Sequence, residues 1–348
     1  MHVWGWRTVF ALVVASLLAA GTATAAPMTT LVVITANPIL ETPNYVGVAR
    51  DIFTKHGFTV RLVPTLPGVG VLQGVVDGTA QVGVAVPHQM ALALAQGANL
   101  KSIFTMHGDA TGRVPTDALY VVIARKASGI REGHLEDLRG KKIGLPATTV
   151  VHEYLFYALS AKGLDPVNDV TIVPTLPAGL IGALQRGSVE AIVAPEMAAS
   201  IAIESTPDAI VVQRGGNYMQ NLTLVVVNSR YLATHPGTMT RYTEAFAEAA
   251  QYIRGHRAET ADLLMRNFVG VTPTAVRSAV GIASPDMRVS KVTVQGAQQS
   301  YDFAIKIKLL KQAPTFEEMF DLRILRQVER EHPELFRDLP PVPEALKL

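Results

Sequence analysis

The sequence predicts an α/β protein with two lobes, each a mostly parallel β-sheet flanked by helices, joined by two crossover strands. The first observation behind this prediction is the pentapeptide VPTLP, which occurs at residues 63–67 and again at 173–177. The second is that the same order of strand-like and helix-like patterns surrounds both copies. The third is a pair of strongly apolar, β-rich segments, residues 118–123 and 222–227, placed between and after the two repeats.

The duplication extends well beyond the pentapeptide. Each half begins with a short apolar strand, continues through a loop into an apolar-faced helix ended by glycine, and reaches a second strand that leads into VPTLP. After VPTLP each half has a helical pattern, a glycine stop, a short β-rich run and a proline. The equivalent segments are 31–34, 45–55 and 68–87 in the first half, and 142–145, 151–162 and 178–195 in the second.

Two β-α-β-α-β units predict parallel sheets with helices on their faces. The two additional strands are suited to carry the chain from one lobe to the other and back. We therefore expect lobe one to contain residues 26–118 and 228–348. C-terminal helices, the first of them over residues 242–254, would complete this lobe. Lobe two is expected over residues 119–227. Near the C-terminus, residues 316–332 read as one amphipathic helix with a solvated charged face.

The N-terminus predicts a secretory signal peptide over residues 1–25. Arg7 forms a short basic region, residues 8–20 are uncharged and apolar, and Ala23-Thr24-Ala25 is a small-x-small cleavage pattern. The alternative is an N-terminal anchor that stays attached. The chain contains no cysteine, so it lacks the residue that carries a bacterial lipid anchor. We expect a periplasmic protein without such an anchor.

Composition narrows the classes of function. Without cysteine the chain cannot form disulfides, cysteine zinc sites or a thiol nucleophile. A net charge of +2 argues against nucleic acid as the main partner. No dinucleotide, Walker, nucleophile-elbow or HExxH motif occurs, and the histidines show no metal-ligand spacing. We therefore expect no cofactor, no metal, no catalytic residue and a monomeric binding protein, not an enzyme.

Ligands of open parallel sheets bind beyond the carboxyl ends of the strands, so the strand-to-helix loops of both lobes supply the candidate binding residues. Several of these residues also have a purely architectural explanation, including tight turns after VPTLP, helix capping by threonine, and a glutamate that favours a helix N-terminus. The candidates are Asn37, Pro38, Gly68, Val69, Gly70, His88, Gln89, His107, Thr148, Thr149, Glu196, Tyr218 and Asn221.

The physical reasons for these candidates differ. The 67–70 turn could offer open helix N–H groups to an anion. His88 and His107 could donate to an anion, although a single histidine is more often a satisfied structural residue. Glu196 could receive a ligand amine or ring N–H. Tyr218 and Asn221 could form an aromatic wall and a polar anchor.

Six segments follow one another along the chain: PNYVGVARDIFTKHGFTVRLV (43–63), GVVDGTAQVGVA (74–85), ALAQGANLKSI (93–103), LRGKKIGLP (138–146), ALQRGSVEAIVAPE (183–196) and HPGTMTRYTEAFAEAAQYI (235–253). In this order they resemble the periplasmic solute-binding proteins of ABC importers. More narrowly, they resemble the family that serves nitrate, sulfonates, taurine and thiamine pyrimidine precursors. The resemblance implies the type II periplasmic-binding-protein fold, closure on a small organic solute, and transient docking on a membrane permease. Enzymes of this fold that make pyrimidines need a cysteine-rich motif, which is absent here.

The sequence thus favours a receptor that captures an anionic or zwitterionic solute, for example a sulfonate, a carboxylate or a pyrimidine-like molecule. Two alternatives stay open at this point. One is a secreted enzyme on the same scaffold, which needs a nucleophile or an acid–base pair in the cleft. The other is a binding protein that serves a sensor instead of a transporter.

Overall fold

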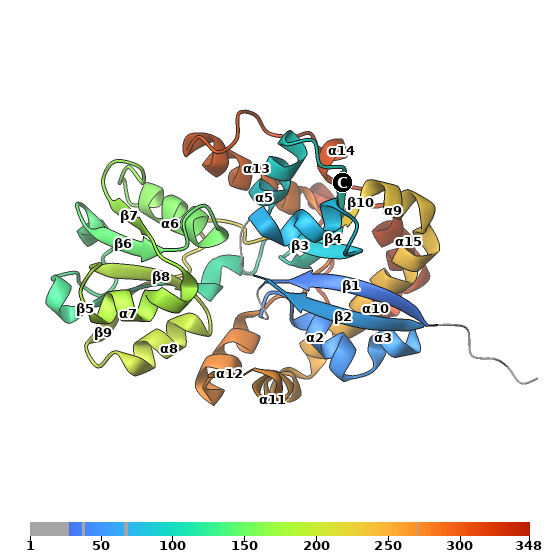
Figure 1. Ribbon diagram of the computed structural model, residues 1–348, viewed down its shortest axis with the longest axis horizontal. Helices are drawn as coiled ribbons and strands as arrows, with labels where there is room; N and C mark the ends of the chain where they lie inside the picture. Colours follow the sequence, from blue (N-terminus) through green and yellow to red (C-terminus); the bar gives the residue numbers. More distant parts are fainter. Residues whose placement is uncertain (1–27, 37–38, 66–68, 269) are drawn as a thin grey trace, which may run out of the picture.

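The computed structural model describes residues 28–36, 39–65, 69–268 and 270–348. The predicted signal peptide lies outside these residues. Two lobes lie side by side, each built on its own five-stranded sheet (Figure 1). None of the helices in the described part of the chain combines the length and apolar character that a membrane crossing requires.

The first sheet has the strand order β2-β1-β3-β10-β4. β1 pairs in parallel with β2 and β3, whereas β10 runs antiparallel to both β3 and β4. Four strands therefore point one way and β10 points the other. The bounds are β1 (Thr29–Thr35), β2 (Phe58–Pro64), β3 (Val82–Ala85), β4 (Leu100–His107) and β10 (Thr223–Asn228).

The second sheet repeats this plan with the order β7-β6-β8-β5-β9. β6 pairs in parallel with β7 and β8, and β5 runs antiparallel to β8 and β9. Each sheet thus contains one reversed strand, in the same position, contributed at a crossover. The bounds are β5 (Tyr120–Arg125), β6 (Lys142–Leu145), β7 (Thr171–Pro174), β8 (Ala191–Pro195) and β9 (Ala209–Arg214).

Helices cover the faces of both sheets (Figure 1). Lobe two has a buried core on each face of its sheet, and lobe one joins its sheet to the C-terminal helices in one large core. Lobe two carries α6 (Val150–Ala161), α7 (Leu180–Gln185) and α8 (Ala198–Ser205). Lobe one carries α2 (Thr42–Ala49), α3 (Ile52–Lys55), α4 (Gln73–Val76), α5 (Pro87–Ala95), α9 (Ser229–Thr234), α10 (Pro236–Gly255), α11 (Arg257–Asn267), α12 (Pro273–Ile282), α13 (Lys291–Lys306), α14 (Phe316–Met319) and α15 (Arg323–Glu331).

The first three residues of each VPTLP segment, 63–65 and 173–175, occupy equivalent corners of the two sheets. In each, the first proline is the last paired residue of an edge strand, with Pro64 opposite Thr35 and Pro174 opposite Leu145. The N–H of the following threonine then donates to the carbonyl of that same partner residue, at 2.8 Å in lobe one and 2.9 Å in lobe two. The repeated pentapeptide therefore marks one architectural corner, present twice.

Two predicted helices are interrupted. The 45–55 helix divides into α2 and α3 because Asp51 adopts a left-handed conformation with φ of 56°. The prediction of a single helix over 316–332 is wrong, because the chain becomes extended at Phe320 and forms a parallel bridge with Ser102 of β4. The N–H of Asp321 donates to the Ser102 carbonyl at 2.9 Å, so this pairing replaces a turn of helix.

The crossovers between lobes are residues 108–119 and 215–222. The predicted extent of lobe two, 119–227, differs from the structure at its second end, because β10 (Thr223–Asn228) pairs with β3 and β4 of the first sheet. The returning crossover therefore ends before Thr223. Each reversed strand lies beside the strands of the lobe that it enters.

Hydrogen bonds tie the two crossovers to each other. The fully buried carboxylate of Asp117 accepts the N–H of Asn217 at 3.1 Å and that of Tyr218 at 2.8 Å. Thr116 Oγ accepts the N–H of Asn221 at 2.8 Å. Burial raises the pKa of Asp117 despite these bonds. The two crossover segments thus form a single hydrogen-bonded connection between the lobes.

Gly215 should be essential to this unit. A Cβ at Gly215 would lie 2.7 Å from the Cα of Ala118, and its φ of +49° is in the left-handed region. We expect Gly215→Ala to lower the free energy of unfolding by roughly 1–3 kcal/mol from overpacking and by about 1–2 kcal/mol more from backbone conformation. Gly129→Ala is the matched control, since Gly129 also has positive φ but has open space around it. Urea unfolding curves that coincide for the two variants would contradict the close approach of the crossovers.

Candidate functional site

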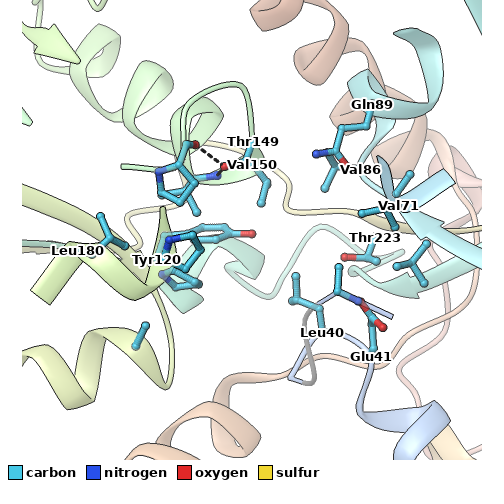
Figure 2. A pocket seen from close by; sticks show the side chains of 18 residues that line it. Leu40, Glu41, Val71, Val86, Gln89, Tyr120, Thr149, Val150, Leu180 and Thr223 are labelled. Carbon is cyan, nitrogen blue, oxygen red and sulfur yellow. Dashed lines mark hydrogen bonds between the residues drawn. The ribbon is translucent and has the colours of Figure 1, made fainter. Parts of the chain in front are cut away.

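A cavity lies between the lobes, at the edges where the strand-to-helix loops of both sheets meet (Figure 2). Its volume is about 120 Å³, an order of size that accommodates a single six-membered ring. Thirteen of the lining residues are apolar, and the polar ones are Glu41, Gln89, Tyr120, Thr149 and Thr223. The apolar ones are Ala36, Leu40, Val71, Val84, Ala85, Val86, Pro146, Val150, Val151, Pro177, Leu180, Pro195 and Ala198.

The two lobes contribute opposite walls. Figure 2 shows Leu40, Val71 and Thr223 on the lobe-one side, facing Thr149, Val150 and Leu180 on the lobe-two side. Loops after β1 and β3 supply most of the first wall. The N-terminal ends of α6 and α7 supply most of the second. A molecule in the cavity would therefore touch both lobes at once.

The reversed strands begin at the cavity. Tyr120 is the first residue of β5 and Thr223 the first of β10, so their amino ends lie where the parallel strands have carboxyl ends. Burial raises the pKa of Tyr120 well above its usual range, so its hydroxyl stays protonated and donates to Asn221 Oδ1 at 2.9 Å. The buried hydroxyl of Thr223 has no hydrogen-bond partner among the described residues.

The structure brings two of the predicted residues to the cavity wall, Gln89 and Thr149. Asn221 is fully buried just behind the wall and contacts it through Tyr120. Thr149 also caps α6: its hydroxyl accepts the N–H of Val151 at 3.2 Å and donates to the carbonyl of Pro146 at 2.7 Å. The capping explanation and the wall position therefore both hold for Thr149.

Three predicted residues, Asn37, Pro38 and Gly68, lie outside the described residues. Val69 and Gly70 begin a 3₁₀ turn, Val69–Leu72, and the next residue, Val71, lines the cavity. The turn after the first VPTLP thus leads directly to the cavity wall. In lobe two the equivalent turn, Pro177–Gly179, supplies Pro177 to the wall.

His88 does not line the cavity but joins the lobes beside it. Its side chain is 2% exposed and extends from α5 of lobe one. Nδ1 lies 3.0 Å from Glu153 Oε2 of α6 and 2.9 Å from Ser300 Oγ of α13, and Nε2 lies 3.2 Å from the carbonyl of Thr148. Ser300 Oγ also donates to Glu153 Oε2 at 2.9 Å. We call these residues, His88, Thr148, Glu153 and Ser300, the interlobe network.

The interlobe network superficially resembles a serine–histidine–carboxylate triad. In such a triad the serine and the carboxylate contact opposite nitrogens of the imidazole, so that a proton can pass between them. Here Ser300 and Glu153 both contact Nδ1. All three side chains are also at most 2% exposed and absent from the cavity wall. This geometry fits a structural connection between α5, α6 and α13.

Other interlobe contacts flank the cavity. On the same side as the interlobe network, Tyr157 of α6 donates to the carbonyl of Gln299 of α13 at 2.6 Å. On the opposite side, Ser278 of α12 donates to Glu196 at 3.1 Å. The lobes are therefore held together on both flanks, and the structure has a closed cleft.

Glu196 belongs to this second flank. Its side chain forms an ion pair with Arg214 and accepts from Ser200 at 2.8 Å and Ser278 at 3.1 Å. It does not line the main cavity. With these partners the Glu196 carboxylate is already compensated by protein groups, so its position fits the architectural explanation better than contact with a ligand amine.

His107 and Tyr218 lie at the crossovers, away from the cavity wall. His107 Nδ1 accepts from the N–H of Ser284 at 3.3 Å, and Nε2 lies 3.5 Å from the carbonyl of Thr116. Burial lowers the pKa of His107 to about 4. Tyr218 is half-buried, and its N–H donates to Asp117. Both residues have structural roles in the connection between lobes.

Sequence reasoning missed Glu41, Tyr120 and Thr223, among others. Ligands of open parallel sheets are expected at the carboxyl ends of the strands, whereas Tyr120 and Thr223 are at the amino ends of reversed strands. The apolar segments 118–123 and 222–227, predicted as crossover strands, contain Tyr120 and Thr223 and could have indicated these two residues. Glu41 lies three residues after the predicted candidate Pro38 and is the N-cap residue of α2.

Within the described residues, no group of three or more histidine, aspartate or glutamate side chains is arranged to hold a metal ion. The cavity has no lysine, arginine or histidine among its described lining residues. The undescribed segments 37–38 and 66–68 contain none of these three residue types either. The wall of the cavity therefore offers hydrogen bonds and apolar surface, and one carboxylate, from Glu41.

Several solved structures share this architecture. The periplasmic aliphatic sulphonate-binding protein SsuA from Escherichia coli superposes with a TM-score of 0.72 at 18% identity, covering 85% of this chain and 92% of that one. The periplasmic nitrate-binding protein NrtA from Synechocystis PCC 6803 gives 0.70 at 12% identity, covering 90% and 92%. The desulfurization enzyme DSZB gives 0.63 at 17% identity, covering 87% and 99%. These similarities confirm the predicted fold, that of two-lobed periplasmic binding proteins.

The particular family follows from the sequence. The chain belongs to the NMT1/THI5-like family, whose model matches residues 40–260. A comparison with curated proteins finds no match. The family match spans the second sheet, both crossovers and the first sheet except β1, and it includes the described cavity-lining residues apart from Ala36.

The buried, neutral His107 should make stability depend on pH. The unfolded chain takes up a proton below about pH 6.5, whereas the folded protein does so only near pH 4. The free energy of unfolding therefore decreases by on the order of 3 kcal/mol as pH falls from about 6.5 to about 4. Urea unfolding at pH 7 and pH 4.5 should show a smaller loss for His107→Gln than for the natural protein. The exposed His256 provides the control His256→Gln, and equal losses in all three proteins would contradict the assignment.

The interlobe hydrogen bond of Tyr157 should favour the closed cleft. Tyr157→Phe removes it, and we expect the closed state to lose about 0.5–1.5 kcal/mol, which small-angle scattering should detect as a larger radius of gyration. Tyr242→Phe is the matched control, because Tyr242 donates to Asn44 within lobe one at 3.0 Å. If Tyr242→Phe expands the protein as much as Tyr157→Phe, the expansion does not arise from the interlobe contact.

Proposed function

We propose that the protein is the periplasmic substrate-binding component of an ABC importer, which captures a small organic solute between its lobes and delivers it to a membrane permease. The observation that carries this proposal is the cavity with walls from both lobes. A solute that touches both walls favours closure, because its contacts exist fully only in the closed state. Docking on a permease would then distinguish the closed, loaded protein from the open one.

The described features fit this mechanism. In the described part of the protein, two crossover segments connect the lobes. The hydrogen bonds on both flanks of the cavity would break when the lobes open. The binding step needs no catalytic group, cofactor or metal. The names of two similar structures, a sulphonate-binding and a nitrate-binding periplasmic protein, supply further support for a solute-binding role.

An enzyme on the same scaffold is the second candidate, since the desulfurization enzyme DSZB shares the fold. It would require an acid–base or nucleophilic pair exposed to the cavity. The histidine and serine that do lie within hydrogen-bond distance, His88 and Ser300, are sealed between helices and contact Glu153 through one imidazole nitrogen. Their geometry favours the binding protein.

The proposal predicts that filling the cavity abolishes binding. Val150 lines the cavity at the start of α6, and an indole there would occupy much of the cavity volume. We expect the purified protein to carry a co-purified solute by native mass spectrometry, or to gain stability in a solute screen by about 2.7 kcal/mol at a hundredfold excess over the dissociation constant. Val150→Trp should lose both effects.

Val167→Trp is the control, since Val167 is 54% exposed in the same lobe and away from the cavity. It should bind as the natural protein does. A screen of sulfonates, carboxylates, amines and heterocycles that never changes the melting temperature, together with no co-purified solute, would refute the proposed function.

A further inference from the structure

Building on the proposed function, we infer that the solute is a compact, largely apolar molecule that carries a cationic amine or another N–H donor and no negative charge. This class differs from the anionic or zwitterionic solutes that the sequence favours. It follows from three features of the cavity: the nature of its surface, the charge of its walls, and the occupied hydrogen-bond donors at the starts of α5 and α6.

The cavity surface is largely apolar. Side chains such as Val71, Val150 and Leu180 approach from opposite lobes (Figure 2). Much of the binding free energy would come from the burial of apolar solute surface. A small, strongly hydrated anion would instead lose its hydration shell against these walls, and it has little apolar surface to bury in return.

The charge of the walls disfavours an anion. No lysine, arginine or histidine contributes to the described lining, and the formal charge that it does contain is the carboxylate of Glu41. Glu41 is 1% exposed, and its Oε1 accepts the N–H of Ala36 at 2.7 Å. In so dry a site, a carboxylate attracts a cation and repels an anion more strongly than it does in water.

Helix N-termini could compensate for absent cations by offering backbone N–H groups, but here two of them are occupied. α5 begins with Pro87, which has no N–H, and the next N–H, that of His88, donates to Ser300 Oγ at 3.2 Å. In α6, Thr149 accepts the N–H groups of Val151 through its hydroxyl and of His152 through its carbonyl. These donors are therefore not available to an anion.

A negative charge and a buried hydroxyl are present on the lobe-one wall. Glu41 and Thr223 both lie on this wall (Figure 2). The hydroxyl of Thr223 is buried without a hydrogen-bond partner among the described residues. It can accept an N–H from a solute, while the Glu41 carboxylate supplies the matching charge. An unsatisfied buried hydroxyl is costly, and a solute amine would satisfy it.

Three probes of matched shape test the charge of the solute: benzylamine, benzyl alcohol and benzenesulfonate. Binding is measured by isothermal titration calorimetry and by the shift in melting temperature at constant ionic strength and pH 7. We expect benzylamine to bind at least tenfold more tightly than benzyl alcohol, and benzenesulfonate to bind more weakly than either.

Two variants test the acceptors. Glu41→Gln should reduce the preference for benzylamine over benzyl alcohol at least tenfold, because it removes the negative charge but keeps the side-chain shape. Thr223→Val should weaken benzylamine more than benzyl alcohol. Glu132→Gln is the control, since Glu132 is exposed and does not line the cavity, and it should leave all affinities unchanged. Should Glu41→Gln fail to fold, the ranking of the three probes on the natural protein still decides the inference.

The outcomes separate this inference from the proposed function. If benzenesulfonate binds as well as benzylamine or better, the protein is a solute-binding protein with an anionic solute, and the inference is wrong. The same conclusion follows if Glu41→Gln leaves the preference unchanged. If no probe binds and the wider solute screen is also negative, both the inference and the proposed function are wrong.

Discussion

The structure depends on how the two crossovers are bonded to each other. Residues 108–119 and 215–222 carry the chain between lobes, and the buried Asp117 holds the second crossover against the first through the N–H groups of Asn217 and Tyr218. This bonding fixes where each crossover strand enters its sheet. Both strands enter in reverse, so the amino ends of β5 and β10 lie at the cavity with Tyr120 and Thr223. The position of the cavity is thus a consequence of the connection.

Closure of the lobes rests on contacts that differ in character on the two flanks. On one flank a buried histidine, a buried glutamate and a serine meet in the interlobe network. Buried polar groups of this kind contribute little net stability but disfavour arrangements in which one partner is left unpaired. On the other flank, Glu196 is paired with Arg214 and reached by Ser278. Together the flanks define one closed geometry around a cavity with largely apolar walls.

The duplicated architecture could be predicted from the sequence because it rests on local patterns. Strand and helix periodicity, glycine stops and the repeated VPTLP are each encoded within a few residues, and the sheets pair as these patterns predict. The interruption at Phe320 could not be predicted, because it depends on pairing with Ser102, more than two hundred residues earlier.

The site was less predictable than the fold, for the same physical reason. The loops after parallel strands indicated Gln89 and Thr149, which do line the cavity. Yet His88 and Glu196 follow the same rule and turn instead towards partners on distant helices, His88 towards Ser300 of α13 and Glu196 towards Ser278 of α12. A strand-end position fixes where a residue lies, but its partners are set by helices that come much later in the chain.

The interlobe contacts affect how much the empty protein differs in conformation from the solute-bound protein. Contacts that exist without a solute raise the population of the empty closed form, and a larger competent population improves apparent affinity. The same contacts reduce the conformational difference between the empty and the solute-bound protein; under the proposed function, a permease that recognises the closed form would then encounter both. The number and strength of bonds such as those of Tyr157 and Ser278 would therefore set a balance between apparent affinity for a solute and the ability of the closed form to signal that a solute is bound.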